Sequence, residues 1–275
     1  MSSAQAPSGL GSALVAKPEH SRLNMLVTAT GVHVVVSSRI SDGTLIYRHI
    51  PFDGTAASQV AAFEDAVYDN PLLLADFGEV NVLIDTPRYI VAPADVDAAA
   101  HLAELYPDFL HEVITSPTGT EGQPVIAAAV EPALLAFVRR TFHGAHINHR
   151  LSPLCRYFGI QRGLGNTGML HLHLADTHTD IIAYGSDGLL MANTVAVRTA
   201  PDTLYFALAA ARHLEFDNAN DRVILSGNTA LRDELLPLLR KHISFVMPMI
   251  FPSAIFKAGH QAMNAPFELT VLTLL

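Results

Sequence analysis

The sequence has one cysteine, no tryptophan and no long run of apolar residues. A single cysteine excludes an internal disulfide and fits a reducing compartment, and the apolar neighbours of Cys155 predict a buried structural thiol. No stretch of about eighteen apolar residues occurs, so no membrane-spanning helix is expected. The N-terminus lacks a basic region ahead of its short, glycine-broken apolar part. We therefore expect residues 1–20 to form a flexible lead-in and the protein to be cytoplasmic.

Charged residues are also scarce, at 16% of the chain, and the 17 basic residues are outnumbered by 26 acidic ones, for a net charge of -9. Lys and Arg do not gather into a basic patch, which argues against nucleic acid as a partner. Half of the 275 residues are hydrophobic. This composition predicts a folded protein with a large core or with two lobes.

Three familiar catalytic motifs are absent. The sequence contains no Walker A pattern GxxxxGK[ST], no HExxH zinc motif and no GxSxG nucleophile elbow. The chain therefore lacks the sequence motifs of a P-loop protein, an HExxH metalloprotease and a serine hydrolase with a nucleophile elbow.

What the sequence does contain is regular apolar patterning. In the first half, this patterning predicts three strands, a helix, two further strands and a helix, at Leu23–Thr28, Val32–Ser38, Thr44–Ile50, Thr55–Tyr68, Val80–Ile84, Tyr89–Val91 and Pro93–Leu105. In the second half, it predicts three strands, a helix, a strand and a helix, at Leu170–Ala175, Ile181–Gly185, Leu189–Val195, Pro201–Leu214, Arg222–Leu225 and Thr229–His242.

The two halves match each other. A Ser-Asp-Gly hairpin turn occurs in each, and the turn glycines, Gly43 and Gly188, lie 145 positions apart. At the same offset Phe63 meets Leu208. The sequence thus predicts a duplicated strand-strand-strand-helix-strand-helix unit. The alternative is a chance match between two common arrangements of a β-meander and a helix.

Further elements are predicted between the two copies, at Pro124–Ala129, Pro132–Thr141, His146–His149 and Leu154–Phe158. The Gly-rich polar stretch Gln161–Thr167 is the predicted linker. Residues 21–160 then form a first lobe and residues 168–275 a second. The apolar C-terminus, Phe267–Leu275, is predicted to be a strand that returns to a sheet.

Three antiparallel strands followed by a helix, a parallel strand and a helix resemble the ribonuclease H-like unit, which occurs twice in actin, sugar kinases and pilus-assembly ATPase relatives. The order of short tracts resembles a bacterial family named domain of unknown function 3822. The tracts are Ile90-Val91-Ala92-Pro93, Arg140-Thr141-Phe142, His149, Leu151-Ser152-Pro153-Leu154, Asn193, Asp202, Tyr205-Phe206, Leu214, Asp217 and Leu225-Ser226-Gly227. They cover most of Leu23–Leu275 and are patterns of apolar and turn residues. The resemblance implies an α/β actin-like ATPase fold of two ribonuclease H-like lobes with mixed sheets, and it implies no established activity.

Actin-like ATPases hold the nucleotide phosphates with two hairpin turns, one from each lobe, and a carboxylate positions Mg²⁺. In this sequence the first turn keeps Thr30 and Gly31 but has no carboxylate. The second turn keeps Asp176 and Thr177 but has His178 where a glycine is usual. Both phosphate-binding turns are therefore weaker than the pattern requires.

The predicted adenosine corner, Leu225-Ser226-Gly227-Asn228, has one glycine where two are usual, and Asp85 follows the fourth strand of the first lobe as a candidate ligand of metal-bound water. The functional interpretation is an ATP·Mg²⁺ site formed by Thr30, Gly31, Asp85, Asp176, Thr177 and Gly227. The alternative is that these are turn residues without a ligand. Because each missing catalytic group costs on the order of 10²-fold in rate, we expect no catalysis and no bound cofactor.

Two groups of histidines suggest a metal, at His171, His173 and His178 and at His143, His146 and His149. A zinc site needs three or four converging ligands, and we expect sheet-face and loop histidines instead. The aromatic pair Tyr205 and Phe206 could dock a partner, but at helical spacing it is expected to pack its helix on the sheet.

The sequence therefore favours a non-catalytic binding or scaffold protein with a degenerate actin-like fold that acts through a protein partner. The alternative is an ATP-binding ATPase or switch that uses the cleft between the lobes. A ribonuclease H-like nuclease ranks last, because two-metal chemistry needs several carboxylates and only Asp85 and Asp176 are candidates.

Overall fold

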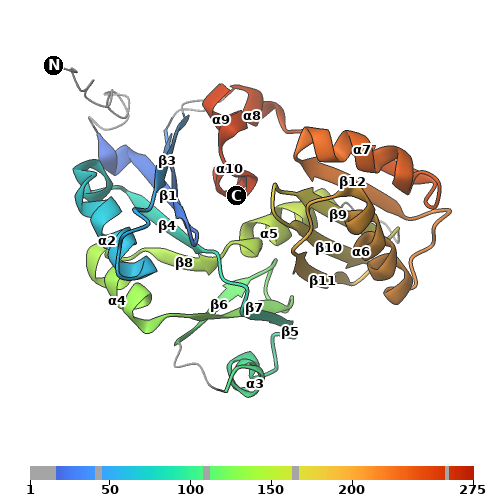
Figure 1. The fold of residues 1–275 in the computed structure, drawn as a ribbon, viewed down its shortest axis with the longest axis horizontal. Helices are drawn as coiled ribbons and strands as arrows, with labels where there is room; N and C mark the ends of the chain where they lie inside the picture. Colours follow the sequence, from blue (N-terminus) through green and yellow to red (C-terminus); the bar gives the residue numbers. More distant parts are fainter. Residues whose placement is uncertain (1–16, 41–44, 108–111, 163–166, 258–259) are drawn as a thin grey trace.

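A computed structural model describes residues 17–40, 45–107, 112–162, 167–257 and 260–275. It contains two five-stranded mixed sheets with helices beside them and a smaller three-stranded sheet (Figure 1). The predicted turn at Ser41-Asp42-Gly43 and most of the predicted linker lie outside the described residues.

The first sheet has the strand order β3-β2-β1-β4-β8. Its strands are β1 Ser21–Val27, β2 Gly31–Ser38, β3 Leu45–Pro51, β4 Glu79–Ile84 and β8 His146–His149. β1, β2 and β3 are antiparallel neighbours, whereas β4 and β8 run parallel to β1. The valine-rich β2 is suited to this pleated, buried position.

The second sheet repeats that order as β11-β10-β9-β12-β13. Its strands are β9 Met169–Leu174, β10 Thr179–Gly185, β11 Gly188–Val195, β12 Arg222–Gly227 and β13 Phe245–Pro248. The senses of the pairings are also the same, with two antiparallel and two parallel neighbours. The predicted duplication is therefore confirmed, including the second Ser-Asp-Gly turn, where Gly188 has a φ of 137°.

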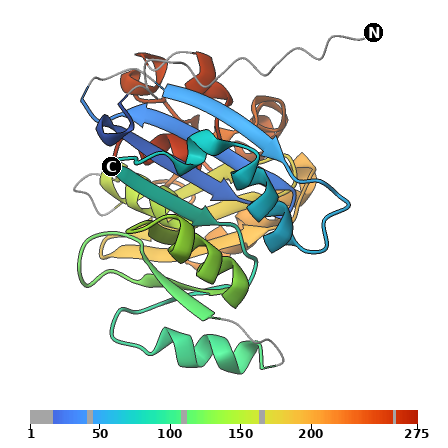
Figure 2. The ribbon, with the colours of Figure 1, turned by 90° about the vertical axis from the view of Figure 1, so that its left-hand side faces the viewer.

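Each sheet packs two helices on its outer face (Figures 1 and 2). They are α2 Gln59–Tyr68 and α4 Pro132–Thr141 in the first lobe, and α6 Ala200–His213 and α7 Thr229–Leu239 in the second. α2 begins four residues later than predicted because the side chain of Ser58 accepts a hydrogen bond from the backbone N–H of Ala61 and caps the helix there.

The second helix of the first unit was assigned wrongly from the sequence. The predicted helix Pro93–Leu105 is the shorter α3 Ala98–Leu105, capped by Asp97. It belongs to an insertion with β5 Tyr89–Ala92, β6 Glu112–Pro117 and β7 Val125–Val130, which form a separate sheet in the order β5-β7-β6. α4, between β4 and β8, takes the place that α7 has between β12 and β13. β6 and β13 were not predicted.

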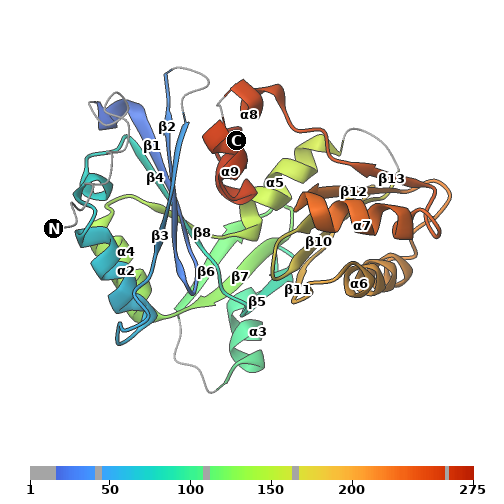
Figure 3. The same ribbon diagram turned by 45° about the horizontal axis from the view of Figure 1, so that its top comes forward.

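Helix α5, Leu151–Gln161, and a C-terminal segment lie between the two large sheets (Figure 3). The C-terminal segment, residues 249–257 and 260–275, contains α8 Ser253–Lys257, α9 His260–Asn264 and α10 Phe267–Val271. α10 packs against α5, β1 and β2, and α9 packs against β3. The segment follows the second lobe in sequence but contacts the first lobe in space.

The prediction that Phe267–Leu275 is a strand was wrong. The carbonyl oxygen of Pro266 accepts hydrogen bonds from the N–H groups of Leu269 and Thr270, which starts a helix. All residues from Phe267 to Val271 are buried. An apolar run that is buried on every side has no period that distinguishes a helix from a strand.

Leu269→Ala should lower the free energy of unfolding by about 2–5 kcal/mol, because Leu269 is fully buried in α10. The matched control is Leu105→Ala, at a leucine that is 62% exposed, which should cost less than about 0.5 kcal/mol. Denaturant unfolding of both variants measures the difference. Equal, small losses would show that α10 is not docked between the sheets.

Candidate functional site

A cavity of about 970 Å³ lies between the two lobes. The β1–β2 turn, the β9–β10 turn, the start of α7 and the C-terminal segment line it. Five of the six predicted nucleotide-site residues are among its lining residues, namely Thr30, Asp85, Asp176, Thr177 and Gly227. The duplicated topology thus brings the two predicted turns to one cavity.

The two glycines of the predicted site are required by backbone packing. A Cβ atom on Gly31 would lie 2.7 Å from Nε2 of His49 and 2.7 Å from the carbonyl oxygen of Ile50. Gly227 has a φ of 91°, and a Cβ atom there would collide with the carbonyl oxygen of Leu174. Each glycine therefore lets neighbouring strands approach closely, whether or not a ligand is present.

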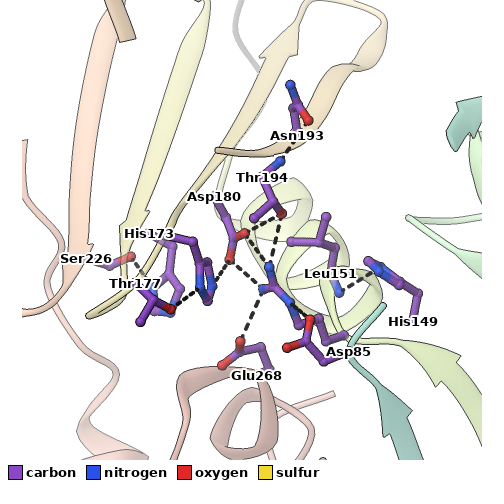
Figure 4. A network of polar contacts seen from close by, with 12 residues as sticks. Asp85, His149, Leu151, His173, Thr177, Asp180, Asn193, Thr194, Ser226 and Glu268 are labelled. Atoms are coloured by element: carbon purple, nitrogen blue, oxygen red, sulfur yellow. Dashed lines mark hydrogen bonds and ion pairs between the residues drawn. The ribbon is translucent and has the colours of Figure 1, made fainter. Parts of the chain in front are cut away.

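The guanidinium of Arg150 is the centre of a buried polar network beside the cavity. Figure 4 shows the network and labels the partners Asp85, Asp180, Thr194 and Glu268. Nη1 and Nη2 donate to Oδ2 and Oδ1 of Asp180 at 2.7 and 2.8 Å, and Nε donates to Oδ1 of Asp85 at 2.7 Å. Nη2 also donates to Oγ1 of Thr194 at 3.0 Å, and that hydroxyl donates to Asp180 at 2.7 Å. Oε1 of Glu268 lies 3.5 Å from Nη1.

These partners come from three parts of the chain. Arg150 joins β8 to α5, and Asp85 follows β4, so both belong to the first lobe. Asp180 and Thr194 lie on β10 and β11 of the second lobe, and Glu268 lies on α10. One guanidinium therefore connects both lobes and the C-terminal segment. Tyr89 of the inserted sheet extends the network, because its hydroxyl donates to Oγ1 of Thr194 at 3.2 Å.

The charges of the network are strongly coupled. Burial alone would raise the pKa of Asp180, but the charge and hydrogen bonds of Arg150 outweigh burial and hold that pKa at about 2. Burial alone would lower the pKa of Arg150, and the carboxylates around it, Asp180 first, raise that pKa instead. Both groups are therefore ionised throughout the physiological pH range.

The carboxylate of Asp176 also has a protein partner. Its Oδ1 accepts a hydrogen bond of 2.8 Å from Nδ2 of Asn228. The other side-chain atom of Asn228, Oδ1, accepts from the backbone N–H of Leu231 and caps α7. Asp176 thus lies at the N-terminal end of α7, where a negative charge is stabilised by the helix dipole.

The model of the family described as "Protein of unknown function (DUF3822)" matches residues 14–246. The chain belongs to this family. No curated protein matches the sequence. The predicted family resemblance is confirmed.

The solved structures that are similar to this DUF3822 protein include the following two. One is a Bacteroides thetaiotaomicron protein with an actin-like ATPase fold and unknown function, at 20% identity and a TM-score of 0.76, covering 94% of this chain and 98% of that one. The other is a PilM–PilN type IV pilus biogenesis complex, at 14% identity and a TM-score of 0.55, covering 92% of this chain and 98% of the matched one. The actin-like ATPase fold is therefore shown.

Within this fold, the two predicted carboxylates of the DUF3822 chain are engaged by its own side chains. Asp85 is bound by Arg150, and Asp176 is bound by Asn228. Thr177 lies on the exposed turn, with Oγ1 3.3 Å from Nδ1 of His178. Nucleotide or Mg²⁺ bound in the usual way would have to compete with these contacts.

The histidines of the two predicted groups do not converge. His143 and His146 are exposed, whereas His149 is buried, with Nε2 3.0 Å from the carbonyl oxygen of Thr86. His171 and His173 share one face of β9, as their alternation predicts. His171 stacks on Phe158, and His173 contacts Phe267 in a tilted arrangement. Among the described residues, no group of three or more His, Cys, Asp or Glu side chains is arranged to hold a metal ion.

A third group of rings was not recognised in the sequence. His33 and His49 stack at 4.3 Å between centroids, and Nδ1 of His33 lies 2.8 Å from the hydroxyl of Tyr47. All three side chains line the cavity. Burial, and secondarily the neighbouring His49, lower the pKa of His33 to about 4, so this ring is neutral at pH 7.

The expectation that Tyr205 and Phe206 pack α6 on its sheet was wrong. Tyr205 is 68% exposed and Phe206 is 38% exposed, and the two rings contact each other edge to face. Alanines on the opposite side of α6, including Ala207 and Ala211, make the contact with the sheet instead. Small side chains there bring the helix close and leave the aromatic rings outside.

Sequence reasoning also missed four residues of the network: Arg150, Asp180, Thr194 and Glu268. One signal was available. Asp180 is an acid within the apolar strand β10, and Arg150 sits between a strand and an apolar helix. Charged residues are rarely buried without a partner, so an ion pair between these two residues could have been predicted from the sequence.

None of the described helices has the length and apolar character needed to cross a membrane. Cys155 is buried and unpaired, as its neighbours predicted.

Arg150→Met should lower the free energy of unfolding by about 3–5 kcal/mol, because it leaves Asp180 buried without its counter-charge. The double variant Arg150→Met, Asp180→Leu should recover more than half of that loss. As a control, Arg139→Met removes an exposed pair with Glu112 and should cost less than about 1 kcal/mol. Additive losses in the double variant would contradict the pairing.

His171 predicts a pH dependence of stability. Neither ring nitrogen has a hydrogen-bond partner among the described residues, and burial lowers its pKa from 6.5 to about 4. The unfolded chain therefore binds the proton first, and stability is lost as the pH falls from about 6.5 to about 4, by roughly 3 kcal/mol for this group.

His171→Phe should reduce the slope of the unfolding free energy against pH over that window, by the amount that corresponds to about one bound proton. The variant should be at least as stable as the wild type at pH 7, since no hydrogen bond is lost. Urea unfolding at several pH values measures both effects. His143→Phe, at an exposed histidine, is the matched control and should leave the slope unchanged. An unchanged slope in His171→Phe would show that this ring is not the buried titrating group.

Proposed function

We propose that this DUF3822 protein is a non-catalytic binding or scaffold protein that acts through a protein partner and does not bind or hydrolyse ATP. The observation that supports this most directly is the buried Arg150 guanidinium, bound to Asp85 of one lobe and Asp180 of the other. Asp85, the candidate ligand of metal-bound water in the first lobe, is therefore already bound by a fixed organic cation.

The charge of the cavity supports the same proposal. Its described lining residues include three carboxylates, of Asp85, Asp176 and Glu268, and Arg150 is the only arginine or lysine among them. That arginine already contacts three carboxylates. A polyphosphate would therefore meet net negative charge, which raises the cost of binding it.

The relation to known complexes supports a protein partner. The pilus protein PilM, whose fold this chain shares along most of its length, is found in a complex with PilN. One fold supports many functions, so the likeness is an analogy. With no described helix able to span a membrane, we also propose that the protein acts in the cytoplasm.

The second candidate function is an ATP-dependent switch. Its specific support is that Thr30, Asp85, Asp176, Thr177 and Gly227 line one cavity. Binding would require Asp85 and Asp176 to exchange their present partners for Mg²⁺ or its waters.

A thermal-shift titration separates the two candidates. Under our proposal, millimolar ATP·Mg²⁺ leaves the melting temperature unchanged, because the cavity offers no free cation to the phosphates. An ATP-binding protein saturated at 100 times its Kd would gain about 2.7 kcal/mol, or roughly 5–10 °C for a chain of this size. A shift of that size that disappears in Asp176→Ala would overturn the proposal.

A further inference from the structure

The cavity between the lobes has an excess of negative charge that the described residues do not neutralise. Asp85, Asp176 and Glu268 line it, and Asp180 lies directly behind Arg150. Arg150 is a single positive charge shared among three of these four acids. The fourth, Asp176, has only the neutral amide of Asn228 as a hydrogen-bond partner among the described residues.

Two deeply buried side chains also leave a polar atom unused on this cavity. The side chain of Glu268 is 8% exposed, and its one polar contact among the described residues is the long 3.5 Å approach of Oε1 to Arg150, so Oε2 has no partner there. His173 is 7% exposed and bonds Ser226 through Nδ1 at 3.0 Å, which leaves Nε2 without a described partner. Both residues line the cavity. Both atoms belong to mostly buried side chains that line the cavity, so they are available to a ligand that enters it.

The remaining wall is apolar and aromatic. Leu26, Phe251, Ile255 and Phe267 line the same cavity, as does Tyr47. Aromatic faces attract cations, and an apolar wall accepts the methylene stem of a long basic side chain. A volume of about 970 Å³ is in the size range of pockets for organic ligands and far exceeds a bare ion.

We propose that the cavity binds a lysine or arginine side chain carried by a segment of the protein partner, with its charged group between Glu268 and Asp176 and its stem against the aromatic wall. This inference rests on the proposed function and gives the partner its chemistry. The ammonium or guanidinium would donate to Glu268 Oε2 and to Nε2 of His173, in the tautomer whose Nδ1–H donates to Ser226. The bound cation would lower the acid excess by one charge without moving Arg150.

The test uses the full chain and defined probes. Isothermal titration calorimetry measures the affinity of the chain for three capped pentapeptides. The first has one lysine between two leucines, the second has arginine in place of that lysine, and the third has acetyl-lysine there. The two basic peptides should bind, and acetyl-lysine should weaken binding by about tenfold or more, because a charge-assisted hydrogen bond is lost. Affinity should also fall as salt is raised.

Two variants locate the site. Asp176→Asn and Glu268→Gln should each weaken the lysine peptide by about tenfold. Asp176→Asn does not touch the Arg150 network, so it remains informative if Glu268→Gln loses stability. Asp95→Asn, at an exposed acid before α3, is the matched control and should leave the affinity unchanged. Equal effects of Asp95→Asn and Asp176→Asn would reduce the binding to general charge attraction and overturn the inference.

Butylamine and ATP·Mg²⁺ complete the test. If butylamine binds as tightly as the peptide, the site takes a free amine and the partner segment is overturned as its source. If no basic probe binds, the cation site is overturned, while the proposed function is decided separately by the absence of a response to ATP·Mg²⁺. If ATP·Mg²⁺ binds and Asp176→Asn abolishes it, the proposed function and this inference both fall.

Discussion

The ion pair between Arg150 and Asp180 is the interaction on which the relative placement of the two lobes depends. Both side chains are buried, and two hydrogen bonds of 2.7 and 2.8 Å join them. Taking such charges out of water is costly, and it is tolerated only when each has its counter-charge. Because the two residues belong to different lobes, opening the cleft would expose or separate both charges together. The pair therefore joins the two copies of the unit, and it also opposes opening of the cleft between them.

The same arginine links acidic groups from both sides of the cleft. Acidic groups that two lobes bring together repel each other unless a cation lies between them. Here a covalently attached guanidinium supplies that charge permanently, at Asp85 and Asp180, and Glu268 extends it to the C-terminal segment. A closed state that depends on a side chain does not depend on nucleotide. Such a cleft can hold a constant shape for a partner, whereas a nucleotide-dependent cleft alternates between states.

The sequence predicted the strand-helix order of both copies, and their duplication, because turn residues bound short apolar runs of strand length. This held even for strands that are buried on both faces, such as β9 and β10. It failed at α10, an apolar run that is also buried all round but forms a helix, and at Tyr205 and Phe206, which lie outside a helix whose alanines face the sheet. The site was predicted in part. Turn chemistry located Thr30, Asp85, Asp176, Thr177 and Gly227, but the partners of the carboxylates lie 65 and 52 positions away in sequence, and no local pattern encodes such a pairing.

Those distant partners also decide how the turn residues are interpreted. An acid in a hairpin turn is equally consistent with a metal ligand and with a local structural role, and only its contacts distinguish the two. Asn228 caps α7 with one side-chain atom and binds Asp176 with the other, so the aspartate completes a helix end. Gly227, next to it, has its positive φ because β12 ends against Leu174 of β9. The features that resemble a nucleotide corner are thus accounted for by the way in which β9, β12 and α7 meet. What those contacts leave unexplained is the surplus of negative charge in the cavity, and a ligand that resolves it must be positively charged.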